Sequence, residues 1–144
     1  MRVLVWQWGR FGSGPRLAAL LAEALRSLPD TDAVLSLSSR AELLRSGAAP
    51  RCDLPVTTYG GLASFAWRVV TAPFAAGGLA QRIAALQPDL AVCAMPGPLD
   101  LLMVAALRWI GILGVGGGYD AVVHPGHVFP MQMWLQRALC RRAD

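Results

Sequence analysis

The sequence predicts an α/β fold, a Rossmann-like, doubly wound and mostly parallel sheet, for a chain of 144 residues. Short apolar runs alternate along the chain with longer segments of helical periodicity. The short runs are apolar at successive positions, which is typical of strands buried on both faces of a sheet. No long linker, repeat or low-complexity segment interrupts this order. We therefore expect one domain over residues 1–144, which could be incomplete.

The first half of the chain begins with an apolar, β-rich run over residues 2–8, which a glycine-rich turn ends. Leucines and alanines at helical spacing follow, until Pro29 and Asp30 stop the pattern. The predicted elements of this half are a strand over 2–8, a helix over 16–28, a strand over 33–38, a short helix over 40–45 and a weaker strand over 56–59.

The second half repeats the alternation and ends on a basic, amphipathic segment. A break at Pro73 and the pair Gly77-Gly78 divides its first helical stretch in two. The predicted elements are helices over 62–70 and 79–86, a strand over 89–94, a helix over 99–109, a strand over 110–115 and a helix over 129–142.

The composition is apolar and basic, with 55% hydrophobic residues, a net charge of +4 and no lysine. The arginines are scattered rather than gathered into a stripe, which argues against nucleic-acid binding. The excess of apolar residues indicates either a sheet covered on both faces or an apolar surface that meets a membrane, a partner or a further domain. Phe65, Trp67 and Phe74 have two interpretations, as a membrane-facing side or as core.

Targeting and redox signals favour a cytoplasmic protein. The start shows no secretory leader, and the apolar stretches are interrupted before the length a membrane span needs. Contact with the inner face of a membrane stays open. The 3 cysteines are far apart and lack metal-ligand spacing, so we expect a reducing compartment and no metal site.

Two turns that follow strands are candidate binding sites. Gly12, Ser13 and Gly14 precede a helix, where glycine lets the backbone approach a ligand and the helix N-terminus attracts anions. Their spacing fits neither a dinucleotide fingerprint nor a P-loop, so a plain turn is an equal alternative. Gly97 lies between two prolines, where its backbone could line a cleft, and Asp100 suits the start of a helix.

A third candidate is the polar loop over residues 119–127, directly after a predicted strand. It contains both histidines of the chain together with Tyr119 and Asp120. Asp120 and His124 could form an acid/base or orienting pair, because a carboxylate can hold an imidazole in one tautomer. Ligands of open α/β sheets bind beyond the carboxyl ends of the strands, where this loop is expected.

Several segments together resemble the N-terminal, acceptor-side domain of GT-B glycosyltransferases of the glycosyltransferase 4-like kind. The likeness covers nearly the whole chain in order, through residues 2–6 with the glycine-rich turn, 87–92, 98–102, 108–112, 120–126 and 136–144. It implies two Rossmann-like domains across a cleft, a sugar transferred from a nucleotide donor to a hydroxyl acceptor, and usually no active-site metal or other cofactor.

The resemblance also implies roles for the candidate residues. Gly12 to Gly14 would face the donor phosphates, and Asp120 and His124 would border the acceptor pocket, where we expect one of them to be the catalytic base or orienting group. We also expect Gly97 and Tyr119 to contact substrate. The chain departs from the family at Tyr119, where relatives have a histidine before the aspartate, and in the glycine-rich strand near residue 115.

The sequence given also stops where relatives continue into the donor domain. We therefore expect this chain, although it is of the hexosyltransferase type, to be inactive alone and to work with a donor half. The acceptor would be a sugar, a polysaccharide or a lipid-linked molecule. The alternatives are a non-catalytic, acceptor-side or membrane-recruiting subunit of a split glycosyltransferase, and a different Rossmann-like enzyme that binds a nucleotide at the turn after its first strand.

Overall fold

The computed structural model describes residues 1–46, 49–97, 99–112 and 114–116. In this part of the chain four parallel strands form one sheet in the order β2-β1-β3-β4. The strands are β1 (Arg2–Gln7), β2 (Asp32–Leu37), β3 (Leu90–Cys93) and β4 (Gly114–Gly116). The helices are α1 (Ser13–Arg26), the 3-10 helix η1 (Glu42–Arg45), α2 (Leu62–Ala84) and α3 (Asp100–Trp109). The predicted α/β class and parallel sheet are confirmed.

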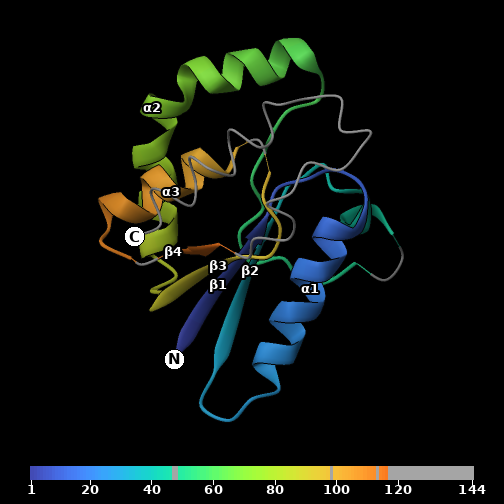
Figure 1. Ribbon diagram of the computed structural model, residues 1–144, viewed down its shortest axis with the longest axis vertical. Helices are drawn as coiled ribbons and strands as arrows, with labels where there is room; N and C mark the ends of the chain where they lie inside the picture. The colour runs from blue at the N-terminus through green and yellow to red at the C-terminus, as the bar shows by residue number, and fades with distance from the viewer. Residues whose placement is uncertain (47–48, 98, 113, 117–144) are drawn as a thin grey trace, which may run out of the picture.

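Helices cover both faces of the sheet, as a doubly wound fold requires (Figure 1). On one face Val3 and Val5 of β1 pack with Ala18 of α1. On the other face the intervening residues Leu4 and Trp6 pack with α2 and α3. Successive residues of β1 after Arg2 are thus all buried, which explains why the strand lacks an alternating polar pattern.

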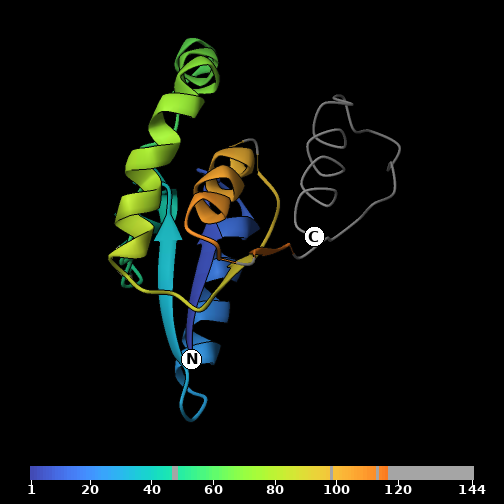
Figure 2. The same ribbon diagram turned by 90° about the vertical axis from the view of Figure 1, so that its left-hand side faces the viewer.

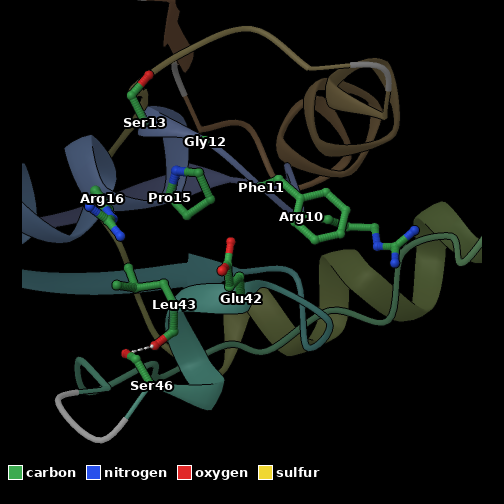
Figure 3. A pocket seen from close by; sticks show the side chains of 9 residues that line it. All are labelled: Arg10, Phe11, Gly12, Ser13, Pro15, Arg16, Glu42, Leu43 and Ser46. Atoms are coloured by element: carbon green, nitrogen blue, oxygen red, sulfur yellow. Dashed lines mark hydrogen bonds between the residues drawn. The ribbon is translucent and has the colours of Figure 1, made fainter.

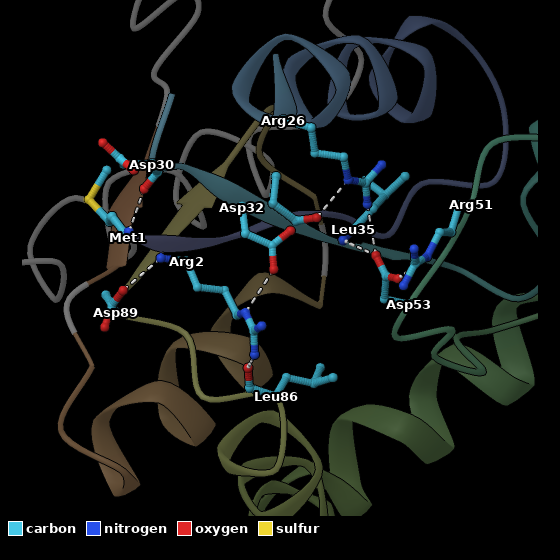
Figure 4. Close-up of polar contacts among 11 residues, drawn as sticks. Met1, Arg2, Arg26, Asp30, Asp32, Leu35, Arg51, Asp53, Leu86 and Asp89 are labelled. Atoms are coloured by element: carbon cyan, nitrogen blue, oxygen red, sulfur yellow. Dashed lines mark hydrogen bonds and ion pairs between the residues drawn. The ribbon is translucent and has the colours of Figure 1, made fainter. Parts of the chain in front are cut away.

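The starts of the strands are joined by one arginine (Figure 4). The Arg2 side chain donates from Nε to Asp32 at the start of β2, at 2.9 Å, and from Nη1 to the Leu86 carbonyl, at 2.9 Å. The Arg2 backbone N–H donates to the Asp89 carboxylate at 2.6 Å, just before β3. These contacts set the register of the three strands at their amino ends.

The predicted third strand over 56–59 is wrong. Val56 forms only an isolated parallel bridge with Ser38 at the end of β2. The backbone N–H groups of Asp53 and Leu54 both donate to the Leu35 carbonyl, so this segment follows β2 briefly. Pro55 has no N–H to donate, and the pairing resumes after it at Val56, whose N–H donates to the Leu37 carbonyl and whose carbonyl accepts from the Ser39 N–H.

The two helices predicted over 62–70 and 79–86 are one helix, α2, with Pro73 inside it. Figure 1 shows a bend in α2, which is what a proline inside a helix produces. The helix continues past the proline because Ala76, Leu79 and Ile83 are buried against the sheet. Packing therefore outweighs the hydrogen bond that Pro73 cannot make.

The remaining elements differ from the prediction mainly at their ends. α1 begins at Ser13 rather than Arg16, and the strand predicted over 110–115 is reduced to β4, because Ile110 and Gly111 still belong to the turn after α3. The helix predicted over 129–142 lies outside the described residues. Among the helices that the structure describes, none is both long and apolar enough to cross a bilayer.

Candidate functional site

The candidate site lies at the carboxyl edge of the sheet, between β1 and β3. β1 connects through α1 to β2 on one side, whereas β3 lies on the other side of β1, so the chain order reverses at this point. Such switch points are where open α/β sheets bind ligands. The parallel strands bring the turn that holds Gly12, Ser13 and Gly14 to the same edge as the turn that holds Gly97.

Gly12 begins α1 in a conformation that favours glycine. Its φ of 84° is left-handed, and no side chain caps the first N–H groups of the helix. A Cβ on Gly12 would meet nothing within 4 Å, so the space beside it is open. The first turn of α1 has neither an acidic residue nor a side-chain cap, and Ser13 there is exposed, as an anion site at a helix N-terminus would need.

At Gly9 and Gly14, glycine is required for a different reason than at Gly12. The Gln7 side chain is buried under the turn, and its Oε1 accepts a hydrogen bond from the Gly9 N–H at 2.7 Å. A Cβ on Gly9 or Gly14 would come within 2.9 Å or 2.6 Å of that side chain. Gly9 and Gly14 therefore make room for the Gln7 side chain. Only at Gly12 is glycine required by the backbone conformation of the turn or by a ligand.

A pocket of about 350 Å³ opens beside this turn (Figure 3). It lies between the β1–α1 turn and η1, on the β2 side of β1 rather than at the boundary between β1 and β3, and the segments that follow β1 and β2 form it. The lining residues are Arg10, Phe11, Gly12, Ser13, Pro15, Arg16, Glu42, Leu43 and Ser46. Two arginines and one carboxylate thus surround an uncapped helix N-terminus, which suits a ligand that has an anionic group.

Arg10 is held at the inner side of this pocket. Its Nη1 donates to the Gly60 carbonyl at 2.9 Å, and its guanidinium carbon lies 4.9 Å from the centroid of the Phe11 ring. Its Nε is buried without a hydrogen-bond partner among the described residues. In Figure 3 this guanidinium points away from Ser13 and Arg16, so Arg16 is the arginine better placed for a ligand at the helix start.

Asp100, the first residue of α3, is fully buried at the switch point. Its Oδ1 accepts from Trp6 Nε1 at 3.2 Å, and its Oδ2 accepts from the Gly97 N–H at 2.5 Å and from Cys93 Sγ at 3.4 Å. One carboxyl group therefore links β1, β3 and the turn between β3 and α3. The Gly97 N–H is used inside the protein by this contact.

Burial dominates the ionisation of this cluster. It raises the pKa of Asp100 to about 6, because the three hydrogen bonds offset only part of the cost of a buried charge. Burial, and then the Asp100 charge, raise the pKa of Cys93, which stays a thiol. Asp100 thus changes charge near neutral pH while it holds the turn beside the site.

The structure separates the predicted site residues into two groups. Gly12, Ser13, Gly14 and Gly97 lie at one edge, and their substrate-binding role stays a prediction. Tyr119, Asp120 and His124 lie outside the described residues, so their roles stay predictions as well. In the described part of the chain, no group of three histidine, cysteine or acidic side chains could hold a metal ion.

Sequence reasoning missed three residues of this edge: Gln7, Arg10 and Asp100. Asp100 was assigned only to the helix dipole, although a lone carboxylate before the apolar run over 101–107 is a signal of a buried polar contact. Gln7 gave a similar signal, because it is the polar residue inside an apolar strand. Nothing in the local sequence distinguished Arg10 from the other arginines.

Comparison with known proteins identifies the architecture. No family model matches the chain, and no curated protein sequence matches it. A Listeria monocytogenes protein assigned as a UDP-N-acetylglucosamine 2-epimerase has a similar structure, with a TM-score of 0.68, 18% identity, and coverage of 100% of this chain and 38% of that one. A second UDP-N-acetylglucosamine 2-epimerase gives a TM-score of 0.61 and 14% identity, over 96% of this chain and 39% of the other.

The chain therefore spans less than two fifths of the length of either structure. At these identities the likeness concerns the fold. Both neighbours have a GT-B-like fold, so the Rossmann-like α/β fold that the sequence predicts for this chain is confirmed. The chain has the α/β fold of one Rossmann-like half of a GT-B-like protein.

Proposed function

We propose that this chain is the N-terminal, acceptor-side half of a nucleotide-sugar enzyme, and that the reaction is transfer of the sugar to a hydroxyl acceptor. The observation that carries the proposal is the uncapped start of α1 at Gly12, which opens on a pocket with Arg16 at the carboxyl edge of a GT-B-like sheet. The neighbours are named for an enzyme of a UDP-sugar, which supports a donor of this class.

The donor diphosphate would meet this half at the α1 start. The backbone N–H and hydroxyl of the exposed Ser13 and the Arg16 guanidinium are donors of the kind that bind phosphate oxygens. We expect the greater part of the donor to be held by a second domain or by a partner chain. No resident cofactor is needed, because the donor enters as a co-substrate.

The transfer would break the bond between the sugar C1 and the diphosphate oxygen and form a bond from C1 to the acceptor oxygen. Asp120 or His124 would take the proton of the acceptor hydroxyl, or would orient the group that takes it. The diphosphate leaves as an anion, which the α1 N-terminus and Arg16 would stabilise. A sugar, polysaccharide or lipid-linked acceptor at the cytoplasmic face of a membrane fits this proposal.

Titration calorimetry with UDP tests the phosphate role of the α1 turn in this chain. We expect Arg16→Ala to weaken UDP binding about tenfold, because one charge-assisted hydrogen bond is lost. Arg45→Ala is the matched control, because Arg45 is also exposed and lies in η1 but does not line the pocket. Equal weakening by both substitutions, or no binding of UDP by the unaltered chain, would contradict the role.

The reaction is tested with this chain joined to the coding sequence that follows Asp144, or mixed with a separate donor half. Release of UDP from UDP-N-acetylglucosamine that requires a hydroxyl acceptor would support transfer, and alanine at Asp120 and at His124 should lower its rate. Transfer at the unaltered rate in both variants would contradict their catalytic role.

A second candidate reaction, epimerisation at C2 of the donor sugar, is favoured by the two structural neighbours. The same mixture distinguishes it. Conversion of UDP-N-acetylglucosamine to its 2-epimer without any acceptor would show that the protein is an epimerase rather than a transferase. Nuclear magnetic resonance of the sugar C2 proton reports the product directly.

A further inference from the structure

The first half of α2 presents large apolar side chains to solvent. Trp67 is 68% exposed, Val70 68% and Phe74 88%. Their spacing of three and four residues places them along one side of the helix. Phe65 and Ala76, on the other side, belong to the core or pack against it. A helix that is apolar on both sides is expected to be covered on both.

This half of α2 also projects from the body of the protein. Figures 1 and 2 show it extending past the carboxyl ends of the strands, beyond the layer that covers the sheet. Its first residue, Leu62, is 85% exposed. Trp109 at the end of α3 is 71% exposed, and its ring lies 4.0 Å from where a Cβ on Gly77 would be. We call Trp67, Val70, Phe74 and Trp109 the apolar ridge.

The charges around the apolar ridge are of one sign. From residue 54 to residue 88 the only charged side chains are Arg68 and Arg82. α3 adds Arg108, and its one carboxyl group, Asp100, is buried. Aspartates 30, 32 and 89 lie at the opposite, amino edge of the sheet (Figure 4). Among the described residues, the charged side chains of α2 and α3 that reach the surface are therefore all arginines, and these three aspartates lie away from them at the amino edge.

We propose that the projecting half of α2, with the apolar ridge, docks on the surface of an anionic lipid bilayer. Tryptophan and phenylalanine insert at the level of the lipid headgroups, and arginines beside them attract anionic lipids. The aspartates at the far edge would point away from the surface.

A second copy of the chain fits this face less well. A twofold contact through this face would add the arginines of the other copy, with no exposed carboxylate on α2 or α3 to pair with them. The bilayer is therefore the occupant that the charge pattern favours. The proposal concerns location and does not depend on which sugar reaction the protein performs.

Cosedimentation of the full chain with vesicles tests the proposal. We expect binding to vesicles of equal parts phosphatidylglycerol and phosphatidylcholine, and weaker binding to phosphatidylcholine alone. The double variant Trp67→Ser, Phe74→Ser should lower partitioning about tenfold or more, because two aromatic side chains that would insert into the bilayer are lost. Arg68→Ala should weaken binding about fivefold, on the anionic vesicles only.

Leu20→Ser is the matched control, because Leu20 is 63% exposed but lies on α1, across the sheet from α2. Circular dichroism and the urea midpoint show that each variant is folded. Three results would overturn the proposal: no binding of the unaltered chain to anionic vesicles, equal binding by the double variant, or a dimer in sedimentation velocity that the double variant dissociates while lipid binding is absent.

Discussion

The two edges of the sheet are built from the same strands but treat their polar groups differently. At the amino edge Arg2, Asp32 and Asp89 pair with one another and with backbone groups (Figure 4). At the carboxyl edge the Asp100 carboxyl is buried without a cation among the described residues, and the Arg10 Nε has no partner there. The polar groups of the amino edge hold the strands together. At the carboxyl edge, polar groups are buried at a cost in folding free energy.

This difference follows from the direction of the chain. In a parallel sheet every helix that follows a strand begins at the carboxyl edge, so uncapped N–H groups and turns gather there. Asp100 is a buried carboxyl group without a cation beside it in the described part of the chain, which costs stability. Such costly residues are expected beside functional sites. The predictions below test whether the cost is really concentrated at this edge.

The largest effect is expected at Asp100. Asp100→Ala leaves Trp6 Nε1 and the Gly97 N–H without their buried acceptor, so we expect a loss of about 3 kcal/mol in the free energy of unfolding. Asp100→Asn keeps an acceptor oxygen and should cost about 1 kcal/mol or less at pH 7. Urea unfolding measures both, and equal losses would contradict the expectation that one acceptor oxygen of the same shape preserves most of the stability.

The second prediction concerns pH. Because the pKa of Asp100 is about 6 in the folded protein and 3.8 in the unfolded chain, the folded state binds the proton first as pH falls. Stability from this group therefore increases between pH 7.5 and pH 4.5, by about 2 kcal/mol. The nearest ionisable group, Cys93, stays a thiol throughout.

Urea unfolding at these two pH values, in the unaltered chain and in Asp100→Asn, isolates the contribution of Asp100. The difference in stability between the two proteins should change by that amount in favour of the unaltered chain at pH 4.5. A difference that stays constant with pH would show that Asp100 is ionised normally and that the carboxyl edge carries no such cost.

A smaller effect is expected at the glycine-rich turn. In Gly14→Ala the new methyl group meets the buried Gln7 side chain at 2.6 Å, so we expect a loss of about 1.5 kcal/mol. Adding Gln7→Ala removes the clash, and the double variant should be more stable than the sum of the two single changes predicts. Strict additivity in thermal unfolding would mean that Gly14 does not serve to make room for Gln7.

The smallest effect is expected at the amino edge. The Arg2–Asp32 pair is 43% and 57% exposed at its two side chains, so Asp32→Ala should cost about 0.5 kcal/mol. The loss should shrink further in 1 M salt, which screens exposed charges. A loss of stability as large as that of Asp100→Ala would contradict the proposed difference between the polar groups of the two edges.

By itself, the sequence determined the α/β class, the parallel strands and the position of the glycine-rich turn, because these follow from local periodicity and turn residues. It did not reveal that 62–84 is one helix, since the packing of Ile83 and its neighbours, and not Pro73, decides where α2 ends. It also failed to separate Phe65, which packs edge-on against Tyr59, from the exposed Trp67 and Phe74.

Only the tertiary structure decided what surrounds each polar side chain. Asp100 and Trp6 are 94 residues apart in sequence, and no local pattern relates them. The sheet places β1 beside β3, buries the carboxyl group between them and so raises its pKa. Hydrophobic periodicity is a property of residues close together in sequence. Burial and the charges around a side chain depend on segments that meet only when the chain folds.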